Sequence, residues 1–356
     1  MTLSRFAHLS SLARPRIAEP DNVRLRLQRN EKPDSWSPDL LAEIFNSIPD
    51  VLVSRYPDPS EFQARLAQFL GVAEGQIVVT SGIDEAIRTL MLLNCGSGDR
   101  VAYATGYAMY DVYSKIFGID PVRIEYRPGE FLTPEALCDQ IPENTKVLFL
   151  PNPNQPVENC FDIGQLRFIA SWCDKHGIIL AVDEAYHFFG GPSAIPLTKE
   201  FDNVLVLRSF SKAFGAAGLR LGYVVAGSMQ IAPLAAIRLA HEANALSLHV
   251  GLRLLDHFES HVLPAVQNIC AGRDYLRNEW RGQGGQAWGE HGNFVLLKLR
   301  DAAQLKHIDS DLKSNGTYVK ASTGGPLDGC LSITCGPRPM MVEVFEQLME
   351  SMKRHG

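Results

Sequence analysis

Short apolar runs alternate with amphipathic segments over residues 77–226, and this alternation limits the possible folds more than any other feature of the chain. The runs predict strands at residues 77–80, 101–104, 122–125, 146–150, 178–182, 204–207 and 223–226. Between them, segments such as 84–93 and 163–175 have the apolar spacing of helices. Regular alternation of strands and helices predicts an α/β fold, in which helices cover both faces of a mostly parallel, seven-stranded sheet.

A different pattern begins after residue 245 and indicates a second domain. A long helical stretch is expected over residues 247–282, with Pro264 kinking or breaking it. A strand, a helix, a strand and a helix are then predicted at residues 293–299, 302–314, 331–334 and 342–353. We expect a large domain over residues 50–245 and a small α+β domain over residues 246–356. Residues 1–49 are proline-rich, and we expect an irregular segment that packs with the small domain.

Length, charge and cysteine content narrow the class of protein. A chain of 356 residues can bury a large core and form two domains. The formal net charge of −6 argues against a nucleic acid or an anionic membrane as a partner. The seven cysteines form no CxxC pair, and an odd number of them suits a reducing compartment. We find neither a signal peptide nor a stretch long enough to span a membrane, so we expect a cytoplasmic protein.

The strongest chemical signal is Lys212, which lies among small and apolar residues just after the predicted strand at 204–207. A desolvated lysine can lose its proton and form a Schiff base. Ser209 and Ser211 precede it and Arg220 follows it, and such hydroxyl and guanidinium groups suit a phosphate. A reactive lysine beside a phosphate site, at the carboxyl end of a strand where open α/β sheets bind ligands, indicates pyridoxal 5'-phosphate (PLP).

Two segments that follow other predicted strands suit the same cofactor. Gly82, Ile83 and Asp84 open a helix, whose free N–H groups and dipole can hold a phosphate. Tyr107 follows the strand at 101–104 and can stack on a pyridine ring. Taken singly, these segments are better explained by an ordinary turn and by core packing.

Polar residues also follow the strands at 146–150 and 178–182. Asn154 and Gln155 lie in a turn rich in proline and asparagine, and either amide can hydrogen-bond a ring oxygen. Asp183 and Glu184 end the next strand, and a carboxylate near a pyridine nitrogen keeps that nitrogen protonated. No histidine or cysteine stands at ligand spacing from these acids, so we expect no metal site.

A further arginine, Arg338, follows the predicted strand at 331–334 and can hold a carboxylate in two parallel hydrogen bonds, although a surface position is equally compatible with its sequence. The chain has no dinucleotide-binding fingerprint, no phosphate-binding loop of the GxxxxGK[ST] type and no GxSxG elbow. The order and placement of all these segments together point to a single PLP site.

With these motifs the chain resembles the fold-type I PLP enzymes, and among them the class I/II aminotransferases of the histidinol-phosphate aminotransferase branch. The resemblance covers nearly the whole chain. It is carried by the stretches Leu27-Gln28-Arg29-Asn30-Glu31, Arg55-Tyr56-Pro57-Asp58-Pro59, Asp183-Glu184-Ala185-Tyr186, Ser209-Phe210-Ser211-Lys212-Ala213-Phe214, Gly218-Leu219-Arg220 and Gly336-Pro337-Arg338.

The resemblance implies a role for each cofactor-binding residue. Lys212 forms the Schiff base and later shuttles a proton, Asp183 pairs with the ring nitrogen, and Tyr186 hydrogen-bonds the ring hydroxyl. Tyr107 stacks on the ring. The expected phosphate ligands are Gly82, Ile83, Ser209, Ser211 and Arg220, and Asp84 is also expected to bind the cofactor.

It also implies partners and substrate contacts. Tyr56 is expected to reach the phosphate from a second subunit, which makes the enzyme a homodimer with shared sites. Arg338, Lys320 and Asn30 are expected to contact the substrate. The implied activity is transfer of an amino group from an amino acid donor to a small oxo acid or a phosphorylated oxo compound.

Two departures from the family pattern affect the substrate and the ring contact. Gln155-Pro156-Val157-Glu158 stands where the family usually has Asn-Pro-Thr-Gly, so either Gln155 or Asn154 makes the contact to the ring oxygen. Lys320 stands where the histidinol-phosphate enzymes carry an arginine that grips phosphate, and an ammonium is a point charge rather than a fork. These departures argue against histidinol phosphate as the substrate.

Two other functions are compatible with the same motifs. A PLP-dependent decarboxylase of a phosphorylated amino acid would break the bond to the carboxylate instead of the bond to the α-proton. A protein that binds PLP without catalysis is a second alternative, which the complete set of expected catalytic residues disfavours.

Overall fold

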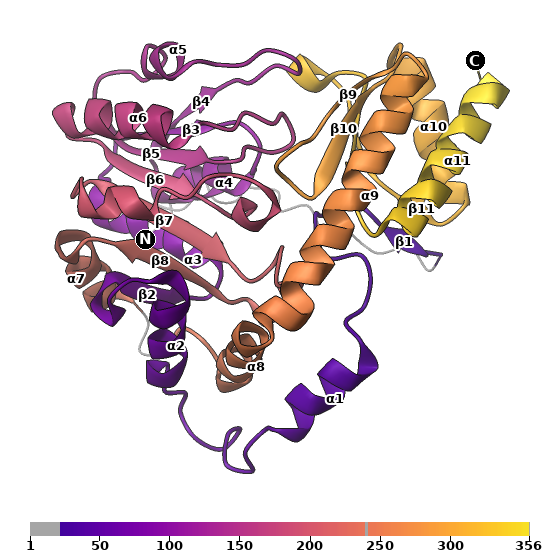
Figure 1. Cartoon of the computed structure of the whole chain (residues 1–356). Helices are drawn as coiled ribbons and strands as arrows, with labels where there is room; N and C mark the ends of the chain where they lie inside the picture. Colours follow the sequence, from indigo (N-terminus) through magenta and orange to yellow (C-terminus); the bar gives the residue numbers. More distant parts are fainter. Residues whose placement is uncertain (1–21, 239–240, 356) are drawn as a thin grey trace, which may run out of the picture.

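The computed structural model describes residues 22–238 and 241–355. Its largest element is a seven-stranded sheet with the order β2-β8-β7-β6-β5-β3-β4 (Figure 1). The strands are β2 (Ile77–Thr80), β3 (Arg100–Ala104), β4 (Asp120–Ile124), β5 (Thr145–Pro151), β6 (Ile179–Asp183), β7 (Val204–Ser209) and β8 (Gly222–Ala226). Strand β8 runs opposite to the other six strands of this sheet. All seven predicted strands and the mostly parallel sheet are confirmed.

Both faces of this sheet are buried. Neighbouring residues of β2 show why, because Val78 and Val79 point to opposite faces and join different apolar clusters. Leu90 of α3 joins the cluster of Val78, and Leu166 of α6 joins that of Val79. The helices between the strands are α3 (Ile83–Asn94), α4 (Met109–Phe117), α5 (Pro134–Cys138) and α6 (Ile163–Lys175), and α7 (Ser228–Ile237) follows β8.

A second sheet, with the order β12-β13-β10-β9, is antiparallel throughout. Its strands are β9 (Gln286–Trp288), β10 (Phe294–Lys298), β12 (Lys320–Ser322) and β13 (Cys330–Thr334). The helices α9 (Leu263–Gly282), α10 (Ala302–Ser314) and α11 (Arg338–His355) lie beside it (Figure 1). We keep residues 50–245 and 246–356 as the proposed large and small domains.

The long helical stretch predicted over 247–282 is interrupted, as expected, but not at its proline. It consists of α8 (Ala245–Asp256), a π-helical turn (Phe258–Val262) and α9. Pro264 lies in the first turn of α9, where a missing N–H costs no intrahelical hydrogen bond. Across the described residues, no helix combines the length and the apolar character needed to cross a membrane.

The segment before residue 50 contains more regular structure than predicted. Strand β1 (Leu25–Arg26) pairs with β11 (Thr317–Tyr318), far along the chain. Helix α1 (Pro38–Asn46) corrects the expectation of an irregular segment. The Ser37 side chain accepts a hydrogen bond from Leu40 N at 3.3 Å and Pro38 opens the helix, a start signal that is visible in the sequence. The chain then enters α2 (Ser60–Leu70).

Candidate active site

A cavity of about 1120 Å³ opens at the edge of the large sheet where β2, β3, β5, β6 and β7 end. It also borders residues 26–32, which we call the N-terminal strap. The structure brings most of the predicted site residues to its wall. They are Asn30, Ile83, Asp84, Tyr107, Gln155, Asp183, Tyr186, Ser209, Ser211, Lys212, Arg220 and Lys320.

Lys212 follows β7 and its side chain is directed to the strap. Its Nζ donates a hydrogen bond to the backbone oxygen of Arg29 at 3.0 Å and lies 5.9 Å from the centre of the Tyr186 ring. Burial lowers the pKa of Lys212 from 10.5 to about 8. A substantial fraction of the amine is therefore neutral near pH 8, as a nucleophile requires.

Asp183, the last residue of β6, lies buried in the floor of the cavity. Its Oδ2 accepts a hydrogen bond from the Tyr110 hydroxyl at 2.6 Å, and its Oδ1 accepts one from Ala185 N at 3.0 Å. Burial raises the pKa of Asp183 to about 6. Tyr110, on α4, is fully buried and was not among the predicted site residues.

Tyr110→Phe is expected to lower the free energy of unfolding by about 1–3 kcal/mol at pH 8, because a buried carboxylate loses a donor. The hydrogen bond from Tyr110 lowers the pKa of Asp183, so its loss raises that pKa above about 6. The destabilisation should therefore be largest above pH 6, where Asp183 is ionised, and smaller at pH 5. Urea unfolding at the two pH values measures the difference.

Tyr126→Phe is the matched control, because the Tyr126 hydroxyl is buried without a hydrogen-bond partner. Its removal should leave stability unchanged or raise it at both pH values. Equal losses in the two variants would show that Tyr110 contributes only ring packing.

The start of α3 and Arg220 form one corner of the cavity wall. Gly82 has a φ of 75°, a conformation that favours glycine, and a Cβ atom placed on it would lie 2.8 Å from an Arg220 side-chain nitrogen. Helix α3 has no side-chain cap, which leaves N–H groups of its first turn for an anion. Ser209 and Ser211 lie on the cavity wall beside Arg220. These groups fit a phosphate.

Asp84 links two other members of this corner. Its Oδ1 accepts from the Tyr107 hydroxyl at 2.6 Å, and its Oδ2 accepts from Arg220 at 3.1 Å. We expected Asp84 among the cofactor-binding residues, but as a carboxylate it would repel a phosphate. Its observed contacts instead hold Tyr107 and Arg220 in place.

The turn after β5 distinguishes the two candidate amides. Asn154 is fully buried, and its side chain donates to the backbone oxygens of Thr105 and Val157 at 3.1 and 2.8 Å. Gln155 lies on the cavity wall, whereas Asn154 does not. The geometry thus favours Gln155 as the amide that can meet a ligand, with Asn154 securing the turn.

The strap residue Asn30 lies on the cavity wall, but its polar atoms are hydrogen-bonded within the protein. Its backbone is left-handed, with φ of 53°. Its Nδ2 donates to the Tyr186 hydroxyl at 2.9 Å and its Oδ1 accepts from Thr334 at 3.0 Å. Its backbone oxygen accepts from Asn293 at 3.1 Å. These bonds commit Asn30 to orienting Tyr186 and to anchoring the strap.

Besides Gly82 and Asn154, two more predicted residues lie away from the cavity wall. Tyr56 is 83% exposed and stacks on His241, with ring centres 4.5 Å apart. Arg338 is exposed at the start of α11, with its guanidinium 5.0 Å from the centre of the Tyr275 ring. Arg338 is thus not among the residues that line the cavity, and the clamp on a substrate carboxylate stays a prediction.

Another pair missed from the sequence is Glu184 and Arg208, which are both buried. Two guanidinium nitrogens of Arg208 donate to the same oxygen of Glu184, at 2.7 and 2.9 Å. The pair joins the ends of β6 and β7, beside Asp183 and Ser209. Removing either partner would leave a buried charge unpaired.

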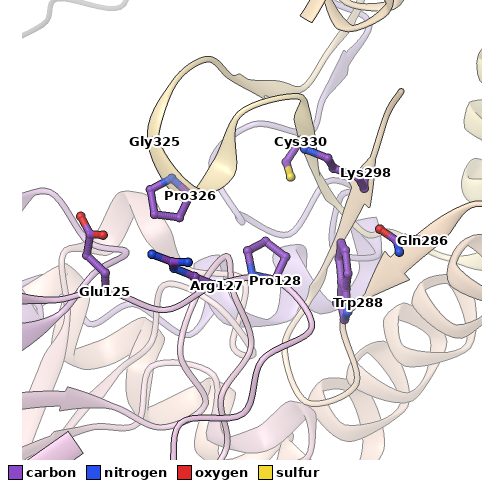
Figure 2. A pocket seen from close by; sticks show the side chains of 9 residues that line it. All are labelled: Glu125, Arg127, Pro128, Gln286, Trp288, Lys298, Gly325, Pro326 and Cys330. Carbon is purple, nitrogen blue, oxygen red and sulfur yellow. The ribbon is translucent and has the colours of Figure 1, made fainter. Parts of the chain in front are cut away.

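A second cavity, of about 540 Å³, separates the loop after β4 from the four-stranded sheet (Figure 2). Arg127 and Pro128 come from that loop, and Trp288 and Lys298 come from β9 and β10. None of the predicted site residues lies on its wall, so the larger cavity is the candidate active site.

Comparison with known proteins also identifies relatives that are aminotransferases. The family described as aminotransferase class I and II matches residues 26–348. A histidinol-phosphate aminotransferase of Caldanaerobacter subterraneus is 32% identical, covering 89% of this chain and 90% of that protein. A histidinol-phosphate aminotransferase of Pyrococcus furiosus is 30% identical, covering 95% of this chain and 96% of that protein.

Solved structures share the fold. A histidinol-phosphate aminotransferase from Sinorhizobium meliloti, in complex with pyridoxal-5'-phosphate, matches with a TM-score of 0.87 and 22% identity, over 100% of this chain and 99% of that one. An L-threonine-O-3-phosphate decarboxylase from Porphyromonas gingivalis matches with a TM-score of 0.76 and 20% identity, over 92% and 99% of the two chains. At these identities the likeness shows the fold, which is the predicted fold type I.

Proposed function

The chain belongs to the class I and II aminotransferase family, and from that membership we propose how its own residues carry out amino-group transfer. It is a PLP-dependent enzyme. PLP, when bound, supplies an aldehyde that captures amino groups and a ring that takes up negative charge. The observation that carries the proposal is a partly buried lysine with a depressed pKa in the same cavity as a buried aspartate.

Lys212 is the nucleophile that attaches the cofactor and the base that moves the substrate's α-proton. Both tasks require a neutral amine, and burial supplies it by lowering the pKa of Lys212 to about 8. The Arg29 backbone oxygen, 3.0 Å from Nζ, holds the amine when it is not engaged.

Asp183 pairs with the cofactor's ring nitrogen and keeps it protonated. Hydrogen bonds from Tyr110 and from Ala185 N support the ionised form of this carboxylate. Tyr186 and Gln155 hold the ring hydroxyl, and Tyr107 covers the ring. Gly82, Ile83, Ser209, Ser211 and Arg220 hold the phosphate, with Asp84 fixing Arg220 and Tyr107.

The substrate pair is an amino acid donor and a small oxo acid or phosphorylated oxo compound. Lys320, at the start of β12, lies on the cavity wall and is exposed there. Its ammonium is suited to a distal anionic group of the substrate.

The test is a single-turnover reaction of the PLP-loaded protein with glutamate, phosphoserine and histidinol phosphate in turn, with carbon dioxide assayed in parallel. Conversion of the cofactor to its aminated form, with release of an oxo acid, is the expected result. Carbon dioxide release with the starting spectrum regained would make decarboxylation the reaction instead.

Two copies of the chain form the working unit in this proposal. Tyr56 is highly exposed and lies off the cavity wall of its own chain, which supports its reaching the phosphate of a second subunit. Sedimentation velocity should show a dimer. An active monomer would rule out this role for Tyr56.

The proposed location of the protein is the cytoplasm, which is a reducing compartment. All seven cysteines are free, and burial raises the pKa of Cys95 and of Cys138 to about 12. Such thiols resist oxidation and fit a protein that needs no disulfide.

A further inference from the structure

We propose that Glu158 is a positioning residue, whose carboxylate joins the turn that carries Gln155 to the loop between β9 and β10. Since Gln155 is proposed to hold the ring hydroxyl, this role rests on the proposed function. Glu158 lies three residues after Gln155, in the stretch that departs from the family pattern. The family usually has a glycine at this position, and a glycine has no side chain that could make such a contact.

The side chain of Glu158 is directed into the loop and is only 7% exposed. Its Oε1 accepts hydrogen bonds from His291 N at 2.5 Å and from Gly292 N at 2.9 Å, and its Oε2 accepts one from Glu290 N at 2.5 Å. Burial acts to raise the pKa of Glu158, but the hydrogen bonds from the loop outweigh it and lower that pKa. An ionised carboxylate therefore holds three successive N–H groups in charge-assisted hydrogen bonds.

The loop is a firm support for the turn, because it is itself bonded to the strap. Asn293, the next residue of the loop, donates from Nδ2 to the backbone oxygen of Asn30 at 3.1 Å. Asn30 Nδ2 in turn donates to the Tyr186 hydroxyl at 2.9 Å. Glu158 thus ties Gln155 to the segments that place Tyr186, and these are the two residues proposed to hold the ring hydroxyl.

The turn has its other fixed points on the large domain. Asn154 N donates to Asn159 O at 3.1 Å, and Asn159 Oδ1 accepts from Leu132 N at 2.9 Å. Glu158 adds a contact on the side of the second sheet. With the turn held from both sides, Gln155 loses little main-chain freedom when it meets a ligand.

The test is a pH titration of the absorbance of the PLP-loaded protein, which changes as the ring oxygen and the Lys212 nitrogen lose their shared proton. Donors to the ring oxygen favour the deprotonated form. Glu158→Gly, which introduces the residue usual in the family, is expected to raise the midpoint by about 0.5–1 pH unit, the effect of weakening one hydrogen bond. Glu158→Gln keeps one acceptor oxygen and should give a smaller shift in the same direction.

Asp162→Ala is the matched control for a purely structural effect. Asp162 lies four residues after Glu158 but caps α6, where its Oδ1 accepts from Gln165 N at 2.9 Å. Asp162→Ala and Glu158→Gly should both lower the free energy of unfolding, measured with urea, whereas only Glu158→Gly should move the absorbance midpoint. An unchanged midpoint in both Glu158 variants would overturn the inference, and so would an equal shift in Asp162→Ala.

A double variant shows whether Glu158 acts through Gln155. In a Gln155→Ala background, Glu158→Gly should move the midpoint by less than half of its shift in the unaltered background, because the donor that it positions is already absent. A full shift in that background would overturn the inference, as would an unaltered protein whose bound PLP shows no such midpoint.

Failure of the proposed function would be distinguishable from these outcomes. The absorbance titration needs only bound PLP, whereas a failure of the proposed function would show as absence of amino-group transfer from any donor in the unaltered protein.

Discussion

Lys212→Ala is expected to abolish amino-group transfer, with turnover reduced by more than about 10⁴-fold, since the variant loses both the nucleophile and the proton carrier. No other lysine lies as near the reaction centre on the described cavity wall: Lys32 is held by Asp34 and Trp36, and Lys320 lies on β12. Borohydride reduction of the PLP-loaded protein, followed by peptide mass spectrometry, should place the adduct on Lys212 and find none in Lys212→Ala.

The pH dependence of cofactor capture gives an independent check. Only the neutral amine attacks an aldehyde, and burial lowers the pKa of Lys212 to about 8. The rate of PLP capture should therefore rise about tenfold per pH unit below pH 8 and level off above it. A rise that continues to pH 10 would indicate an ordinary surface lysine.

Lys212→Arg is the control for folding, because it keeps a long cationic side chain that cannot form the Schiff base. It should be as inactive as Lys212→Ala, with the circular dichroism spectrum of the unaltered protein. A borohydride-stable adduct in either variant would mean that the Schiff base forms at another residue.

The pattern of apolar residues along the sequence was sufficient to predict the sheet that carries the site. Strands such as β6 and β7 are buried on both faces, so they appear in the sequence as continuous apolar runs. Polar residues at their carboxyl ends, including Asp183 and Lys212, then share one edge by the geometry of parallel strands. For this reason the sequence alone was enough to group the residues that follow β2, β3, β5, β6 and β7 into one site.

Side-chain direction was not predictable in the same way. Arg338 follows the end of β13 by four residues and Lys212 follows the end of β7 by three, yet Arg338 faces Tyr275. Its direction depends on packing between α9 and α11, which a strand-end rule does not contain. Asn154 and Gln155 differ for a similar reason, since burial in the turn commits one amide and leaves the other on the cavity wall.

Contacts between distant segments were missed for a different reason. Tyr110 meets Asp183 across 73 positions in sequence, and periodicity reports only on residues within one element. The strap is similar, because Asn30 reaches Thr334 of β13 and Asn293, which directly precedes β10. Resemblance identified Asn30 as important, but only the structure shows its bonds to Tyr186 and to the second sheet.

Asp183→Asn is expected to lower turnover by about 10²–10³-fold or more, because a neutral amide cannot keep the ring nitrogen protonated. In the protein without cofactor, burial raises the pKa of Asp183 to about 6, so the group is mostly ionised at neutral pH and can meet a cationic ring nitrogen as an anion. A nearby positive charge lowers the pKa of a carboxyl group, so pairing should extend the ionised range to more acidic pH.

Single-turnover rates at pH 8 measure this effect, with PLP saturation confirmed by absorbance. Asp84→Asn is the comparison, since Asp84 shares the cavity but bonds Tyr107 and Arg220. It should weaken PLP binding while changing the rate of the saturated enzyme much less. An Asp183→Asn enzyme that retains a rate within tenfold of the original would show that the charge on Asp183 is not what activates the ring. The burial of that carboxylate would then serve only to position Tyr110 and the start of the loop that carries Tyr186.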